Sequence, residues 1–92
     1  MIAPADIPYL PRGVRLHFDK VRDNWMLLAP ERAIRLDPIG HAILSAIDGE
    51  KSFQAITQTL SQTYNAPAEE IEKDSAGFLN ALKDRRFLEV RR

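Results

Sequence analysis

The sequence contains no cysteine, a single tryptophan and only four glycines. Without cysteine the chain can form no disulfide, no thiolate metal site and no cysteine nucleophile. No apolar run approaches the length that a membrane-spanning helix needs. The first residues, MIAPADIPYLPRG, carry three prolines and an acid where a signal peptide needs a basic start and an apolar core. These absences predict a cytoplasmic protein without a membrane segment.

A surplus of charge of either sign is also absent. Thirteen basic and thirteen acidic side chains cancel to a formal net charge of zero over 92 residues. A chain without a net positive field does not attract nucleic acid or an anionic membrane, so we expect neither partner. A hydrophobic content of 45% in a chain of this size supports one domain with one modest core.

The first third of the chain is predicted to form an arm and then a small sheet. We expect residues 1–12 to be a flexible arm without regular structure, because three prolines each remove an amide donor and fix φ. Apolar and polar residues alternate from Val14 to Phe18, as in a half-buried strand. Further strands are predicted at 24–28, which is apolar enough for the middle of the sheet, and at 32–36.

Three helices are predicted after the strands. Asp37 and Pro38 form a good N-cap and first turn, with an apolar stripe at 39, 43, 46 and 47 and a stop at 48–49. A second helix should begin after Ser52 and end at Asn65, and a third should run from about 67 to 84. Residues 87–90 could close the chain as an extended segment. The fold class is therefore α+β, a three-stranded antiparallel sheet followed by three helices in one domain over residues 13–92.

Catalytic chemistry has little support in the sequence. His17 and His41 are the two imidazoles, and neither has a second metal ligand three or four residues away. Glu69 and Glu70 stand at a helix start, where carboxylates complement the helix dipole. We therefore expect no catalytic residues, no metal, no cofactor and no enzyme activity.

Several motifs together resemble one known family. They are Trp25-x-Leu27-Leu28-Ala29-Pro30-Glu31-Arg32, Asp37-Pro38, Ile43-Leu44, Asp48-Gly49, then Ile56, Leu60 and Tyr64, and finally Ile71, Asp74, Leu79 and Leu82. From roughly Pro11 to Leu88 the chain resembles the PqqD family, peptide chaperones of pyrroloquinoline quinone (PQQ) biosynthesis. The stretch LLAPER is the most specific part. The chain departs from the family pattern at Gly40, Ser75 and Arg86, where Ala, an apolar residue and Gly are usual.

This resemblance implies a winged-helix-like fold and a binding function. The family recognises the leader of a ribosomally made precursor peptide, PqqA, and presents it to PqqE, a radical S-adenosylmethionine enzyme that cross-links a glutamate and a tyrosine of the peptide. In such domains the leader adds a strand beside the third strand, in a cleft against the third helix. The short charged strand at 32–36 would then be a free sheet edge that docks a ligand.

The residues expected to bind the peptide come from these two elements. On the strand, Ile34 and Leu36 could equally serve the core, while Arg32 and Arg35 could meet acidic leader side chains. On the third helix a stripe with small side chains would leave room for a bound chain, although a solvated helix face is the alternative. The full set is Arg32, Ala33, Ile34, Arg35, Leu36, Asp74, Gly77, Phe78, Ala81 and Arg85.

Two other functions stay open at this stage. A winged helix–turn–helix protein would bind DNA through basic residues on one helix, and the C-terminal end of the chain does carry a basic cluster. That cluster is also what a helix C-terminus with a solvated tail would show. An obligate dimer could instead cover the strand edge, and the sequence is compatible with a monomer or a weak homodimer. The cluster comprises Lys83, Arg85, Arg86, Arg91 and Arg92.

Overall fold

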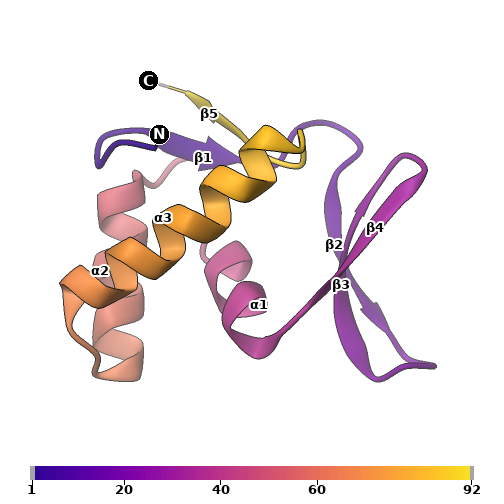
Figure 1. Cartoon of the computed structure of the whole chain (residues 1–92), viewed down its shortest axis with the longest axis horizontal. Helices are drawn as coiled ribbons and strands as arrows, with labels where there is room; N and C mark the ends of the chain where they lie inside the picture. The colour runs from indigo at the N-terminus through magenta and orange to yellow at the C-terminus, as the bar shows by residue number, and fades with distance from the viewer. Residues whose placement is uncertain (1, 92) are drawn as a thin grey trace.

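The computed structural model describes residues 2–91; Met1 and Arg92, the two ends of the predicted arm and domain, lie outside it. The three predicted strands and the three predicted helices follow one another in the expected order, with a further short strand before them and another after them (Figure 1). The elements are β1 (Ile7–Tyr9), β2 (Arg15–Asp19), β3 (Asn24–Ala29), β4 (Arg32–Leu36), α1 (Pro38–Ser45), α2 (Phe53–Tyr64), α3 (Ala68–Asp84) and β5 (Glu89–Arg91).

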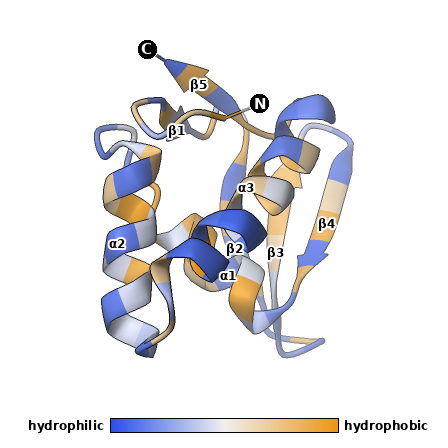
Figure 2. Cartoon of the chain, turned by 60° about the vertical axis from the view of Figure 1, so that its left-hand side comes forward, coloured by the Kyte–Doolittle hydropathy of each residue, from blue (hydrophilic) through white to orange (hydrophobic). Residues whose placement is uncertain are grey.

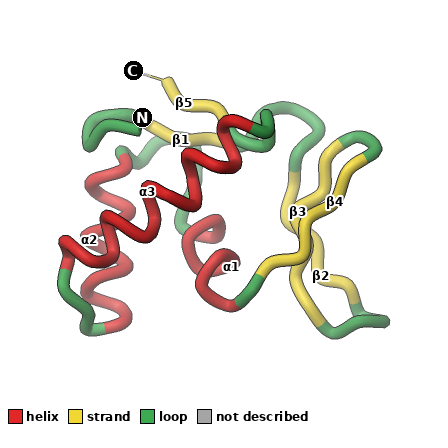
Figure 3. The backbone as a smooth tube through the Cα atoms, viewed as in Figure 1, coloured by secondary structure: helices red, strands yellow, loops and turns green. Residues whose placement is uncertain are grey.

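The main sheet has the strand order β2-β3-β4, so β3 is central as its apolar sequence predicts. All pairings are antiparallel, and Leu16, Leu27 and Ile34 lie side by side across the three strands. The sheet stands on the right of Figure 1 and packs one face toward the helices, with Leu27 fully buried. Figure 3 shows this three-stranded sheet to one side of the helices, whereas β1 and β5 form a separate pair close to them.

Local capping chemistry explains where the helices begin and end. The Asp37 carboxylate accepts a hydrogen bond of 2.6 Å from the Gly40 amide, and Pro38 occupies the first turn. Ser52 caps α2 by accepting from the Ala55 amide, and α2 ends at Asn65, whose φ of 50° is left-handed. These boundaries agree with those predicted from the sequence.

The first helix differs from its prediction in two respects. It ends at Ser45, with Ala46 as its C-cap, several residues before the predicted stop at 48–49. It also buries Gly40, Ile43 and Leu44, so the predicted stripe is wrong at Ile39, which is 69% exposed. Gly40 is buried, and a Cβ there would lie 3.1 Å from the Phe78 ring of α3, so the backbone of α1 and this ring approach closely.

The N-terminal arm is the main correction. Residues 1–12 do not lack regular structure, because β1 pairs with β5 through Pro8 and Val90. The arm also supplies backbone acceptors to the start of α2, where the Phe53 amide donates to the Asp6 carbonyl at 2.7 Å and the Gln54 amide to Pro4. Prolines remove donors but keep their carbonyls, so a proline-rich segment can still satisfy the free amides of a helix N-terminus.

One hydrophobic core joins the sheet, the helices and both ends of the chain. Figure 2 shows apolar segments of β3, α1 and α2 turned inward, whereas the first half of α3 is largely hydrophilic. No helix in the described part is both long and apolar enough to cross a membrane. The buried apolar residues are Ile2, Leu27, Leu36, Ile43, Leu44, Phe53, Ile56, Leu60, Leu79, Leu82, Phe87 and Leu88.

Candidate functional site

β4 is an edge strand. It pairs with β3 on one side and with no other strand of residues 2–91 on the other. An edge strand keeps one row of amide and carbonyl groups free of sheet partners, and those groups can accept a further strand. The identity of the outward-facing groups therefore decides how a ligand could pair.

The turn between β3 and β4 indicates which groups face outward. The ring of Pro30 holds its φ at about −65°, and Glu31 has a φ of 63°. This combination is a type II turn, whose hydrogen bond joins the flanking residues Ala29 and Arg32. Because amides along a strand alternate in direction, we infer that those of Arg32, Ile34 and Leu36 face β3. The backbone groups of Ala33 and Arg35 then face outward.

The opposite turn leads to the same assignment. A four-residue loop joins β2 to β3, and its last residue, Asp23, has φ 54°. A left-handed residue at this point suits a hairpin whose flanking residues, Asp19 and Asn24, form a hydrogen-bonded pair. The amides of β3 alternate from Asn24 onward, so every second one, ending at Ala29, faces β4. Two independent turns thus agree on the outward row.

The side chains of β4 divide between two faces, and only one face is open. Leu36 is buried and Ile34 half-buried, so both belong to the core, while Ala33 and Arg35 are exposed on the other face. Arg32 shares the inner face, and its guanidinium lies 4.3 Å from the centre of the buried Phe87 ring. The two arginines of β4 therefore point to opposite faces and do not form one rim.

Arg32 also ties β4 to α3. Its Nη1 donates a hydrogen bond of 2.7 Å to the carbonyl oxygen of Arg85, the C-cap of α3. The Arg85 guanidinium lies 5.6 Å from the same Phe87 ring. A cation at a helix C-terminus is favourable, so this contact holds the start of β4 beside the end of α3.

The predicted stripe on α3 is open to solvent. Asp74, Gly77, Ala81 and Arg85 are all exposed, and a Cβ on Gly77 would meet nothing within 4 Å. Phe78, expected in the peptide site, is half-buried and packs on the core. From Asp74 to Arg85 the helix extends about 16 Å, and from Arg32 to Pro38 the backbone of β4 and the next two residues extends about 20 Å. The two surfaces are of comparable length, and the structure brings them together at the Arg32–Arg85 contact.

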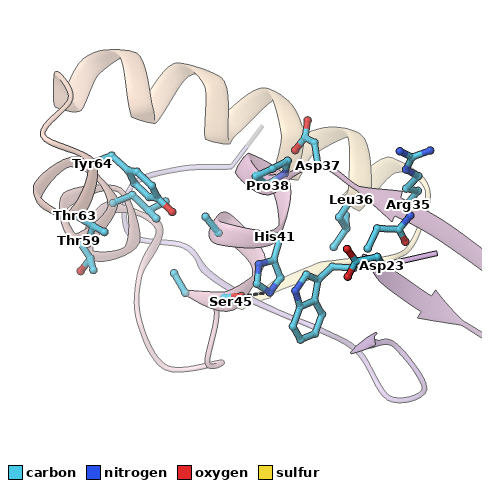
Figure 4. A pocket seen from close by; sticks show the side chains of 15 residues that line it. Asp23, Arg35, Leu36, Asp37, Pro38, His41, Ser45, Thr59, Thr63 and Tyr64 are labelled. Carbon is cyan, nitrogen blue, oxygen red and sulfur yellow. Dashed lines mark hydrogen bonds between the residues drawn. The ribbon is translucent and has the colours of Figure 1, made fainter. Parts of the chain in front are cut away.

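Two hollows lie at the far end of β4, and the sequence did not indicate them. The larger, about 1120 Å³, is open and lined by both sheet and helix residues (Figure 4). In it the His41 ring stacks on Trp25 with 4.2 Å between ring centres, and His41 Nε2 lies 3.1 Å from Ser45 Oγ. The smaller, about 270 Å³, lies among α1, α2 and α3.

The serine–histidine contact does not make a catalytic site. Ser45 and His41 are four residues apart on α1, which alone brings their side chains together. A hydrolytic triad needs an acid that orients the imidazole, and among residues 2–91 no carboxylate forms a hydrogen bond or ion pair with His41. No group of three or more potential metal ligands occurs among residues 2–91.

Together the fold and the edge define a small α+β domain of the winged-helix-like kind, open at one strand. Residues 24–88 match the family model described as coenzyme PQQ synthesis protein D (PqqD). The PqqA binding protein of Rhizobium meliloti is 43% identical over 98% of this chain and 92% of its own length. The chain belongs to the PqqD family, which confirms the resemblance seen in the sequence.

Other similar proteins agree in sequence and fold. The bifunctional coenzyme PQQ synthesis protein C/D of Methylorubrum extorquens is 47% identical over 92% of this chain, which spans 23% of that larger protein. The solution structure of the PqqD part of the Methylobacterium extorquens protein has a TM-score of 0.84 at 45% identity, covering 97% of this chain and 95% of that one. Its description calls it a functional, stand-alone recognition element for ribosomally made, modified peptides. The crystal structure of PqqD from Xanthomonas campestris has a TM-score of 0.61 at 40% identity, covering 97% and 99%. The predicted α+β, winged-helix-like fold is thereby confirmed.

Proposed function

We propose that this protein binds the precursor peptide PqqA by adding its leader as a strand to β4, and presents it to the radical S-adenosylmethionine enzyme PqqE without catalysis of its own. The names of the relatives support PqqA as the ligand. The single structural observation that carries the proposal is the free edge of β4. We place this activity in the cytoplasm, where a ribosomally made precursor is first available.

Each part of the predicted site has a role in this proposal. The backbone groups of Ala33 and Arg35 pair with the peptide, while Ile34 and Leu36 hold β4 against the core. The open stripe of α3 forms the facing wall, and Arg32 keeps the two surfaces together through Arg85. The wall consists of Asp74, Gly77, Phe78, Ala81 and Arg85.

The expected affinity suits a carrier that must release its cargo. Each backbone hydrogen bond contributes only ~0.5–1.5 kcal/mol net, and a buried apolar anchor contributes roughly 1.5–3 kcal/mol. Ordering a disordered leader costs ~2–5 kcal/mol. A few bonds with two or three anchors therefore lead to a dissociation constant of about micromolar or somewhat tighter.

An amide-shift titration by NMR tests the proposal directly. Synthetic PqqA peptide should shift the resonances of residues 32–36 and 74–85, and a scrambled peptide of equal composition should not. A flat response, or shifts confined to residues 12–23, would contradict strand addition to β4. The same titration at two salt concentrations should differ little, since backbone pairing involves no net charge.

The alternatives predict different behaviour. The start of α3 carries three exposed glutamates, Glu69, Glu70 and Glu72. These carboxylates would repel DNA phosphates, which argues against α3 as a DNA-recognition helix. A gel shift that weakens steeply with salt would nonetheless favour DNA. We propose a monomer or weak homodimer, and sedimentation at low micromolar concentration should show mainly monomer. A tight dimer with no peptide binding would favour the obligate-dimer alternative.

A further inference from the structure

The smaller hollow lies just beyond the end of β4. It is about 270 Å³ in volume and is lined by residues from the first turn of α1, the end of α2 and the start of α3. Its lining is apolar apart from Asp74 and Ser75. The lining residues are Pro38, Ile39, Ala42, Ile43, Leu60, Tyr64, Ile71, Asp74 and Ser75.

Two large, exposed side chains stand at this hollow. Ile39 on α1 is 69% exposed and Tyr64 on α2 is 59% exposed, although both side chains are large and mainly apolar. Pro38 and Tyr64 also line the larger hollow, so the two spaces adjoin (Figure 4). Isolated exposed apolar residues are common, but a pair beside an apolar hollow marks a binding surface.

The hollow continues the path of β4. Asp37 remains extended, with φ −80° and ψ 171°, so the free edge runs one residue past the strand. Backbone pairing must stop here, because α1 begins at Pro38 and the Asp37 carbonyl accepts a hydrogen bond of 3.0 Å from the His41 amide. A peptide paired with β4 that passes this point is therefore held only through its side chains. Pro38 and Ile39, the next residues along the chain, line the hollow.

We propose that this hollow receives one apolar side chain of the same peptide that pairs with β4, at a position just outside the paired segment. The inference rests on the proposed function. Recognition then has two parts, a sequence-tolerant one through the backbone of β4 and a selective one through the hollow. The side chain is aliphatic or aromatic, because the lining offers almost no polar partner.

The size and charge of the hollow favour this occupant over others. A space of 270 Å³ accepts one large side chain and its neighbours in part, and it falls just below the range of about 300–1,000 Å³ typical of small-molecule sites. Asp74 at its border forms no ion pair within residues 2–91 and would disfavour an acidic residue beside the anchor. A neutral or basic flank is therefore expected.

A pair of exposed residues provides a matched test. Ile39→Asp places a charge at the hollow, and a carboxylate in the first turn of a helix does not weaken folding. Val21→Asp makes the same change at a side chain that is 95% exposed in the β2–β3 turn. With synthetic PqqA peptide in calorimetric titration, Ile39→Asp should weaken binding roughly ten- to hundredfold, the loss expected for one apolar anchor. Val21→Asp should leave the affinity unchanged.

Methyl-labelled protein gives an independent measurement. In the wild-type complex, the methyl groups of Ile39 and Ile71 should show intermolecular NOEs to an apolar side chain of the peptide, and those of Val21 should show none. Equal affinity of Ile39→Asp and Val21→Asp, while Ala33→Pro still weakens binding, would overturn the hollow as an anchor and leave strand addition intact. Failure of the wild-type protein to bind PqqA would overturn the proposed function itself.

Discussion

A proline scan of β4 tests both the outward row of amides and the docking mode. Ala33→Pro removes an amide that we infer faces solvent, whereas Ile34→Pro removes one that faces β3 next to Leu27. Ala33 is exposed, and its substitution by proline keeps the Cβ and removes no buried group, so the domain should keep its fold. Proline there can even stabilise slightly, by about 0.4–1 kcal/mol, because it restricts the unfolded chain.

The two substitutions should differ strongly in stability. Ile34→Pro breaks a ladder hydrogen bond and leaves a carbonyl of β3 unpaired, which costs about 1–3 kcal/mol. It also removes a half-buried apolar side chain, for which Ile34→Ala is the control at about 1–2 kcal/mol. The sum, roughly 2–5 kcal/mol, is a large part of the ~5–14 kcal/mol expected for a domain of this length.

The assay combines melting with peptide titration. By circular dichroism Ala33→Pro should melt like the wild-type protein, yet its affinity for PqqA should fall roughly two- to tenfold or more, since one intermolecular bond is lost and the ring crowds the ligand. If Ile34→Pro stays folded and Ala33→Pro unfolds, the assignment from the two turns is wrong. If Ala33→Pro folds and binds with unchanged affinity, the peptide does not pair with this strand.

Four further predictions concern other contacts. Arg32→Gln should lower the unfolding free energy by about 1–2 kcal/mol through loss of the contacts with Arg85 and Phe87, whereas Arg35→Gln should not change melting; equal effects would refute the structural role of Arg32. Deletion of residues 2–6 should lower the melting temperature by at least several degrees, because it removes the carbonyls that bind the α2 amides; an unchanged melt would mean that the arm is dispensable. The Tyr9 hydroxyl donates a hydrogen bond of 2.7 Å to Glu89, which raises the pKa of Tyr9 above its ordinary value of 10.0. The stability that this bond contributes is therefore complete below pH 10 and is lost as the pH rises through the raised pKa of the folded state. In an absorbance titration of the Tyr64→Phe variant, Tyr9 should ionise above pH 10, and ionisation at or below pH 10 would contradict the bond. Arg35→Val should increase self-association in sedimentation experiments relative to Arg12→Val, which makes the same change in a loop; equal sedimentation would show that Arg35 does not guard the edge.

Much of the fold could be predicted because its signals are local. The caps at Asp37, Ser52 and Asn65 act within three or four residues, so a reader of the sequence can see both partners. The alternation in 14–18 and the apolar run in 24–28 fix the strand order in the same way. The free edge followed from the shortness and charge of β4.

The rest depends on contacts between distant residues. The paired residues Pro8 of β1 and Val90 of β5 lie 82 positions apart (90 − 8), and no local pattern near Pro8 indicates this partner. The assignment of the outward amides on β4 depends on the positive φ angles of Asp23 and Glu31, and these angles could not be predicted from the sequence. The sequence did not predict the structural role of Arg32, because its hydrogen-bond partner Arg85 lies 53 positions away. The stacking of His41 on Trp25 is likewise tertiary.

Arg32 and Arg35 point to opposite faces of β4, and this explains how the strand can pair with a peptide but not with β4 of a second molecule. If two β4 strands paired antiparallel through the outward amides of Ala33 and Arg35, the two Arg35 side chains would be diagonal neighbours on one face, about 7–8 Å apart between backbones. Two like charges at that distance disfavour the pair. Arg32 cannot relieve this repulsion, because it is held on the other face by Arg85 and Phe87. A peptide with a neutral or acidic side chain opposite Arg35 meets no such cost, so the same arginine that weakens self-pairing leaves the edge open to its ligand.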